Sequence, residues 1–255
     1  MMEFDDIREQ DYPFVSVCFH VNENNEMNGS GERRTKWMKD KRPDEQIIKV
    51  ARLDGKTAGF VILYPIEKSP WGPEGKGLYV MSCIEVPLRG HGIGKGLMQA
   101  AEEEVKKRGG KGIAVTAYNW DVPFMPSSFF EKMGYEVASQ RGPEQLMWKK
   151  FDDSGTPPAF LEKKYEYTPV AGKVVVDLFH NGSCMTMDIE RERVREVAAE
   201  FGDKVVLNEY DCNNTETIKE YGIFRGIFVN GKEYYWGYDA PREGIREAIN
   251  KELKG

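Results

Sequence analysis

A dense run of glycines is the part of this chain whose spacing could do chemistry. It opens the stretch LRGHGIGKGLMQAAEEEVKKRGG, which begins at Leu88 and passes at once into helix-forming sequence. The glycines are Gly90, Gly92, Gly94 and Gly96. The first N–H groups of a helix lack internal partners and lie at the positive end of its dipole, so a bare backbone there can bind a phosphate, with Arg89 adding charge. The pattern predicts a pyrophosphate site, and a turn that only permits tight packing remains the alternative.

The neighbouring segments have the patterns of strands and helices that would carry this turn. Three predicted strands, rich in β-branched and aromatic residues, precede it. After it, apolar residues from Ile93 to Val105 recur at helical spacing, and the helix is expected to stop at Gly109. Another strand, a short helix and two final strands would complete a mixed sheet. The strand segments are QIIKVARLD, TAGFVILYPIE, GLYVMSCIEV, GIAVTAYNW, YEVAS and EQLMWKKF, and the short helix is PSSFFEKMG.

Together, the turn and its flanking segments resemble motif A of the GNAT superfamily of N-acetyltransferases. The signature (Q/R)-x-x-G-x-(G/A) is met by Arg89, Gly92 and Gly94, and the segments VMSCIEV and FFEKMGYEV flank it in the order of that superfamily. The resemblance covers residues 1–150. A Rossmann site fits less well, because a meander of strands precedes the glycines and no acidic residue about 20 positions further on ends a second parallel strand.

This resemblance implies an acetyl-CoA site in a cleft between two splayed strands, which end at Val86 and near Trp120. The backbone around Ile84 and Val86 would pair with the pantetheine arm and point an N–H at the thioester carbonyl. The pyrophosphate would rest on the backbone of Arg89, Gly90, His91, Gly92, Ile93 and Gly94. The implied reaction is direct attack by an amine, of a small molecule or a protein, on the thioester in a ternary complex. It needs a base that frees the amine and an acid that protonates the leaving thiolate.

One expected catalytic residue is missing. Where such enzymes commonly have a general-acid tyrosine, this chain has Phe130, and a phenyl ring cannot donate a proton. Tyr118, at the end of a splayed strand, is the first substitute, and Glu85 is the carboxylate nearest to the expected thioester and could act as base through a water. A purely structural role stays open for both. Cys83 lies on the opposite strand face from Ile84, so we expect a core thiol rather than a nucleophile.

Length and charge limit the classes of protein that this chain can belong to. It has 255 residues and a net charge of −6, without the basic stripe that would bind nucleic acid. No apolar run approaches the ~18 residues of a membrane span, and the acidic start MMEFDDIREQ is unlike a signal peptide, so we expect a cytoplasmic protein without a membrane partner. The four cysteines lie far apart, which predicts reduced thiols and no metal site.

The chain is also longer than a usual single domain. We expect an α/β (α+β) protein in which residues 1–150 form the mixed-sheet GNAT domain, residues 151–172 a linker and residues 173–255 a smaller domain. The whole net charge falls after residue 150. Strand and helix patterns alternate from VVVDLF to PREGIREAINKEL, an order that resembles a thioredoxin-like domain of the kind attached to YoaP-type acetyltransferases.

The second domain lacks the usual redox motif. The sequence CMTM keeps Cys184 but has Met187 in place of a second cysteine, and FRG stands where a cis-proline is expected. Dithiol exchange is therefore not expected, although a thiol at a helix start can be reactive. Two functions stay open: an N-acetyltransferase that uses acetyl-CoA, or a CoA-binding or thiol-responsive regulatory protein. The acceptor and the oligomeric state stay open too, although the segment Asn22–Glu45 lies where the superfamily's acceptor-facing helices occur.

Overall fold

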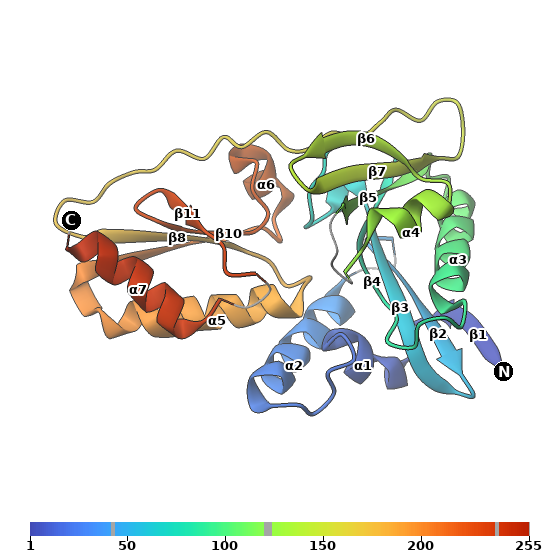
Figure 1. Cartoon of the computed structure of the whole chain (residues 1–255), viewed down its shortest axis with the longest axis horizontal. Helices are drawn as coiled ribbons and strands as arrows, with labels where there is room; N and C mark the ends of the chain where they lie inside the picture. The colour runs from blue at the N-terminus through green and yellow to red at the C-terminus, as the bar shows by residue number, and fades with distance from the viewer. Residues whose placement is uncertain (42–43, 120–123, 238–239, 255) are drawn as a thin grey trace. The chain divides into compact units, whose positions relative to one another are not determined.

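The computed structural model describes residues 1–41, 44–119, 124–237 and 240–254. Its chain divides into two compact units (Figure 1). The first unit contains Met1–Val21 and Lys39–Leu161, and the second contains Asn22–Met38 and Glu162–Gly255. Whether the domains expected from the sequence fold independently stays a prediction. The compact units differ from the expected bounds in two respects: the segment Asn22–Met38 groups with the C-terminal part, and the expected linker 151–172 is divided between the units after Leu161.

A seven-stranded sheet in the order β1-β2-β3-β4-β5-β7-β6 forms the first unit. In this sheet the β4–β5 pair is parallel and the other pairs are antiparallel, which confirms the mixed sheet. Strand β1 was not predicted, because in MEFDD only Met2 and Phe4 alternate with acidic residues, which is too short a pattern to indicate a strand. The strands are β1 (Met2–Asp6), β2 (Ile47–Leu53), β3 (Lys56–Pro65), β4 (Tyr79–Glu85), β5 (Gly112–Tyr118), β6 (Glu136–Arg141) and β7 (Glu144–Lys150).

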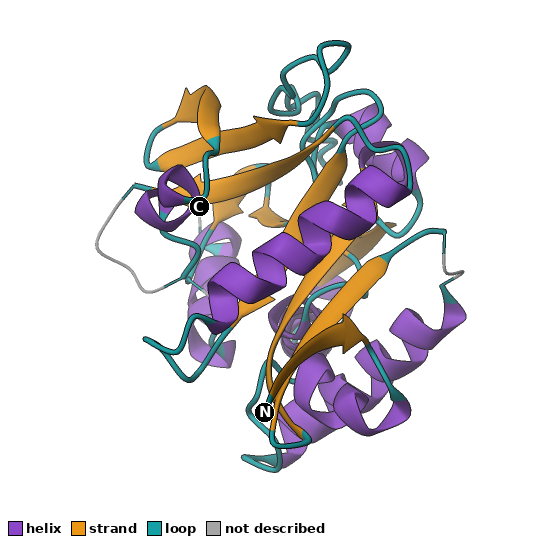
Figure 2. Cartoon of the chain, turned by 90° about the vertical axis from the view of Figure 1, so that its right-hand side faces the viewer, coloured by secondary structure: helices purple, strands orange, loops and turns teal. Residues whose placement is uncertain are grey.

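Helix α3 (Ile93–Lys107) lies across one face of this sheet (Figure 2). Its apolar residues at helical spacing, among them Leu97, Ala101 and Val105, are fully buried in the core. The helix therefore forms where the periodicity predicts it, and the left-handed Gly109 (φ 75°) follows its end. The shorter helices of the unit are α1 (Tyr12–Ser16), α4 (Ser127–Lys132) and the 3-10 turns η1 (Glu9–Asp11) and η2 (Ile66–Lys68).

A four-stranded sheet in the order β11-β10-β8-β9 forms the centre of the second unit. Strands β8 and β9 are parallel, and β10 runs antiparallel to both β8 and β11. Helix α2 (Asn25–Asp40) belongs to this unit as far as Met38. The other elements are β8 (Val174–His180), α5 (Met185–Glu200), η3 (Gly202–Lys204), β9 (Val205–Asp211), α6 (Thr215–Tyr221), β10 (Gly226–Val229), β11 (Lys232–Tyr234) and α7 (Arg242–Leu253).

The segment that precedes β8 has no helix or strand over residues 160–170, and its later part is fastened to the second unit. The hydroxyl of Tyr165 donates to Oδ2 of the buried Asp177 (2.6 Å), and that of Tyr167 lies 3.1 Å from Oδ1 of Asn230. The ring of Tyr165 also packs on Phe228, with centroids 4.5 Å apart. Two aromatic anchors therefore fix the expected linker to this sheet before β8 begins.

Candidate active site

The glycine run forms the turn between β4 and helix α3. Gly90 (φ 82°) and Gly92 (φ 73°) have the left-handed backbone that glycine adopts without strain, and Gly92 is the N-cap of α3. Nothing lies within 4 Å of the position that a Cβ would take at either residue. The backbone at the start of the helix is therefore open to close approach at these two positions.

The other two glycines of the run allow packing. A Cβ at Gly96 would overlap the ring of Phe4 on β1, and a Cβ at Gly94 would lie 3.3 Å from the ring of Phe129 on α4. Gly94 and Gly96 thus have the packing role of the alternative interpretation, and the phosphate site at Gly90 and Gly92 stays a prediction. The first two glycines keep the turn open, whereas the last two let β1 and α4 pack against α3.

Strands β4 and β5 diverge beside this turn. Their parallel pairing covers three residue pairs, the last of which is Met81–Val115. Beyond that pair, β4 continues to Glu85 in register with β3, and β5 continues to Tyr118 in register with β7. This divergence agrees with the splay that the family resemblance implies. Trp120, near which the second strand was expected to end, lies outside the described residues.

Glu85 ends β4 as a half-buried carboxylate. Burial raises the pKa of Glu85, and the negative charge that Cys18 carries when ionised raises it further. The N–H of Val86, which donates to the carboxylate, lowers the pKa, and so do the positive charges of His20 and Arg89. Burial outweighs them, so Glu85 holds a proton more readily than an ordinary glutamate does.

Tyr118 ends β5, the strand on the other side of the divergence. Its N–H donates to the carbonyl of Met125 (3.0 Å), and its half-buried ring lies 6.1 Å from the ring of Phe124. Phe130, at the place of the family's tyrosine, is fully buried and meets the ring of Tyr135 edge-on at 5.7 Å. Phe130 therefore belongs to the core of this unit, and a proton donor must come from another position.

The other predicted site residues fall into two groups. The first consists of turn residues, all exposed: Arg89, Gly90, His91 and Gly92. The second consists of side chains that pack on the core, half-buried or fully buried: Ile84, Val86 and Ile93. The second group can therefore meet a ligand chiefly through its backbone, as the resemblance implies. Cys83 is a half-buried free thiol.

Sequence reasoning missed two residues near Glu85. The structure brings Cys18 and His20, from the turn after α1, within electrostatic reach of this carboxylate. No spacing rule connects them, because strands β2 and β3 separate them from β4 in the chain. The one feature of the sequence that could have drawn attention to His20 is that the chain has only three histidines.

In the second unit, Cys184 is the half-buried N-cap residue of helix α5. Arg225, in the FRG stretch, donates to both carboxylate oxygens of Glu190 (3.0 and 2.6 Å), and no peptide bond among the described residues is cis. The other thiol of this unit, Cys212, is fully buried, and burial raises its pKa to about 12. Cys184 is therefore the accessible one of the two thiols.

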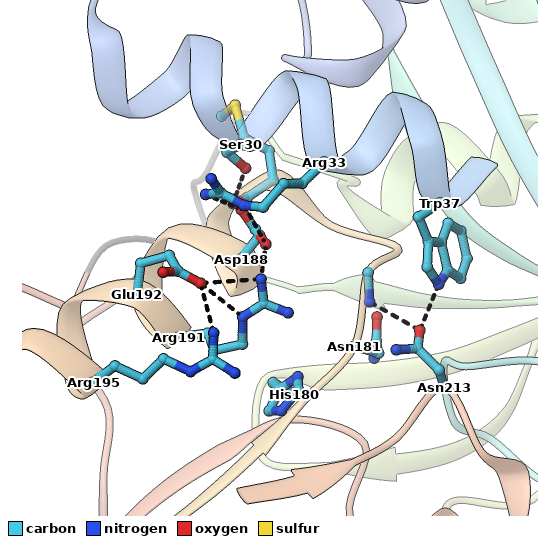
Figure 3. A network of polar contacts seen from close by, with 12 residues as sticks. Ser30, Arg33, Trp37, His180, Asn181, Asp188, Arg191, Glu192, Arg195 and Asn213 are labelled. Carbon is cyan, nitrogen blue, oxygen red and sulfur yellow. Dashed lines mark hydrogen bonds and ion pairs between the residues drawn. The ribbon is translucent and has the colours of Figure 1, made fainter. Parts of the chain in front are cut away.

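Helix α2 comes from the segment expected to face an acceptor, and its polar side chains hold it to the second unit (Figure 3). Ser30 Oγ donates to the Met185 carbonyl (3.1 Å), and Arg34 Nε donates to the Ser183 carbonyl (3.0 Å). Ser30 and Arg34 are at most 2 % exposed. The two acceptor carbonyls flank Cys184, so the start of α5 and helix α2 are fastened together.

Two further contacts continue this fastening along α2 (Figure 3). Arg33 Nε donates to Oδ2 of Asp188 (2.9 Å), and Trp37 Nε1 donates to Oδ1 of Asn213 (2.6 Å). The same Asn213 oxygen accepts the N–H of Gly182 (3.0 Å). Three residues of α2 are thus bound directly to the loop and helix around Cys184, and Trp37 is linked to that loop through Asn213.

No group of three or more His, Cys, Asp or Glu side chains among the described residues could hold a metal ion. No helix that they form has the length and apolar character needed to cross a membrane.

The chain is similar to known acetyltransferases. Residues 4–135 match the model of one family, described as the acetyltransferase (GNAT) family, whereas no curated protein matches the sequence. Similar solved structures include the PaiA N-acetyltransferase of Thermoplasma acidophilum in complex with coenzyme A (16 % identity, 59 % of this chain, 99 % of that chain, TM-score 0.43). They also include a GNAT-family acetyltransferase of Brucella melitensis in complex with acetyl-CoA (21 % identity, 62 % of this chain, 92 % of that chain, TM-score 0.41). A third is the aminoglycoside 6′-N-acetyltransferase of Enterococcus faecium (18 % identity, 58 % of this chain, 96 % of that chain, TM-score 0.44).

Proposed function

Because this chain belongs to the acetyltransferase (GNAT) family, we propose that it is an N-acetyltransferase that moves the acetyl group of acetyl-CoA to an amine acceptor. The observation that carries the proposal is the open glycine turn at Gly90 and Gly92, next to the point where β4 and β5 diverge. Backbone N–H groups at a helix start bind phosphate oxygens when no side chain covers them. The turn is thus suited to a pyrophosphate, and the diverging strands to the acyl arm.

The proposed reaction is a direct attack in a ternary complex. The amine nitrogen bonds to the thioester carbonyl carbon, and Glu85, directly or through a water, accepts the proton that the amine loses. A backbone N–H of residues 84–86 donates to the oxygen on which negative charge develops. The carbon–sulfur bond then breaks, and Tyr118 donates a proton to the thiolate sulfur. The raised pKa of Glu85 supports its role as base, and the position of Tyr118 at the end of β5 supports its role as acid.

For the second unit, the proposal is a thioredoxin-like fold that serves binding rather than dithiol exchange. The strand order β11-β10-β8-β9, with β8 and β9 parallel and β10 antiparallel, supports the fold. Buried Met187 in the first turn of α5, and Arg225 in place of a cis-proline, argue against a redox centre.

A CoA-binding or thiol-responsive regulatory protein is the second candidate. Two observations favour it: Phe130 replaces the usual proton donor, and Cys184 stands at the start of a helix of 16 residues. Release of CoA from acetyl-CoA, measured across a panel of small-molecule and peptide amines, separates the two functions. Amine-dependent release supports the enzyme, whereas binding of acetyl-CoA without release supports the regulatory protein.

A further inference from the structure

A glycine of strand β3 lies against the end of strand β4. Gly59 is buried, and a Cβ at this residue would lie 2.9 Å from the carbonyl oxygen of Glu85, which is too close for a Cβ. The backbone of Gly59 is outside the left-handed region, so an alanine could adopt the same conformation. What this position requires is therefore the absence of a side chain, and not the conformational freedom of glycine.

The space beside Gly59 is filled by residues from both ends of the glycine turn. The Cγ2 atoms of Val86, which follows β4, and of Ile93, which begins α3, lie 3.3 and 3.2 Å from the position of that Cβ. Cγ2 of Val86 also lies 3.9 Å from the position that a Cβ of Gly94 would take. Val86 thus packs between a glycine of β3 and a glycine of α3, and this close packing fixes the place where β4 passes into the turn.

The orientation of the Glu85 carbonyl determines where the next N–H points. Because its oxygen lies against Gly59, the carbonyl points towards β3. No peptide bond among the described residues is cis, and in a trans peptide unit the C=O and the N–H point in opposite directions. The N–H of Val86 belongs to the same peptide unit as that carbonyl, so it points away from β3. Since β4 lies between β3 and β5, this N–H is directed to the side on which β5 diverges.

We propose that Gly59 is a positioning residue for acetyl transfer: by leaving room for the Glu85 carbonyl, it directs the Val86 N–H to the thioester oxygen of acetyl-CoA. This inference rests on the proposed function, in which a backbone N–H of residues 84–86 donates to that oxygen, and it assigns the donor to Val86. The Glu85 carboxylate accepts this same N–H, so an oxygen atom can reach it, and the thioester oxygen would take the place of the carboxylate. A Cβ at Gly59 would displace the shared peptide unit and turn the N–H away from the oxygen on which negative charge develops.

Gly59→Ala adds one methyl group and tests the inference in the full chain. In protein labelled with 15N-valine, the amide signal of Val86, identified by its absence in Val86→Ile, should move in Gly59→Ala. Acetyl-CoA should move this signal of the parent further than CoA does, because only acetyl-CoA has the carbonyl that accepts the N–H. In Gly59→Ala, kcat should fall by about tenfold or more, because the donor is misaligned. The Kd of CoA should stay within about twofold, because its pyrophosphate binds at the glycine turn.

Gly112→Ala is the matched control. Gly112 is buried at the opposite end of β5 from Tyr118, and its backbone is also outside the left-handed region. A Cβ there would also meet a backbone carbonyl of the neighbouring strand, that of Lys149, at 2.5 Å. This variant should lose stability as Gly59→Ala does, but its Val86 signal should stay in place and its kcat within about twofold of the parent.

An unmoved Val86 signal in Gly59→Ala would overturn the inference. So would an equal loss of kcat in both variants, or weaker binding of CoA with unchanged kcat, since a general loss of packing produces those patterns. If Gly59→Ala does not fold, Gly59→Ala/Ile93→Ala removes the obstructing side chain and keeps the contact with the Glu85 carbonyl, so the same results are expected of it. A parent without turnover, in which the Val86 signal still depends on Gly59, would refute the enzyme proposal and leave the orientation of the N–H standing.

Discussion

Arg33 on helix α2 binds Asp188 on helix α5 through two nitrogens, Nε at 2.9 Å and Nη2 at 2.6 Å from the same carboxylate oxygen. Asp188 is 3 % exposed, and its other oxygen accepts a hydrogen bond from Arg191 (2.6 Å). A helix encoded between two parts of the first unit is therefore bound by charge to the second unit. The contact makes the second unit discontinuous in sequence.

The first prediction concerns this contact. Asp188→Asn should destabilise the second unit by about 2–4 kcal/mol, because it leaves the two arginines without their shared buried partner. Hydrogen–deuterium exchange should quicken in both α2 and α5. Lys219→Ala removes an exposed ion pair with Glu216 (2.7 Å) on the same unit and should change stability by less than about 0.5 kcal/mol. Faster exchange in α5 with unchanged protection of α2 would contradict the discontinuous unit.

The second prediction concerns acetyl-CoA binding. Gly92→Leu should weaken acetyl-CoA by at least about tenfold in Kd, because the side chain would cover the N–H groups at the start of α3. Gly142→Leu is the matched control: Gly142 (φ 59°) is also left-handed and open, so it carries a similar backbone strain away from the turn. Calorimetry that finds the same acetyl-CoA affinity in both variants would place the site elsewhere.

The third prediction concerns Tyr118 as the proposed general acid. Tyr118→Phe should lower kcat by the ~10²–10⁴-fold that follows loss of a positioned proton donor, with little change in the affinity for acetyl-CoA. Tyr135→Phe, in the buried core beside Phe130, should leave kcat within about twofold. Steady-state kinetics with undiminished kcat in Tyr118→Phe would remove Tyr118 from the mechanism.

The fourth prediction concerns Glu85 and pH. Glu85→Gln should lower kcat and abolish the acid limb of the pH profile. It should also be more stable than the parent at neutral pH. The pKa of Glu85 is raised in the folded protein, so the stability linked to it is present below the ordinary pKa of glutamate and is lost as the pH rises through the raised value. Denaturant unfolding at pH 4 and pH 8 should show the advantage of Glu85→Gln only at the higher pH, and an equal effect at both would contradict the shift.

The fifth prediction concerns Cys184. Cys184→Ser should leave acetyl transfer nearly unchanged, and the full chain should show no insulin reduction with dithiothreitol, because Met187 cannot resolve a mixed disulfide and Cys212 is buried. Robust reduction that disappears in Cys184→Ser would support the thiol-responsive alternative instead.

Local patterns in the sequence were enough to predict most of the elements of both units and the glycine turn. The spacing of apolar residues in α3, and the left-handed conformation that Gly92 adopts without strain, depend on near neighbours only, so the chain itself reveals them. The family resemblance depends on the same local motif. Strand β1 escaped prediction because only two apolar residues, Met2 and Phe4, mark its apolar face.

Tertiary structure alone decided which distant residues meet. The burial that raises the pKa of Glu85, and the electrostatic interactions of Glu85 with Cys18 and His20, involve segments far apart in the chain. Aromatic rings from β1 and α4 decide which glycines of the turn are open and which are packed. Hydrogen bonds to carbonyls and carboxylates around Cys184 fix the position of α2 on the second unit. These contacts join segments far apart in the chain. The packing of whole helices and strands decides which of them form, and the local spacing of residues does not encode that packing.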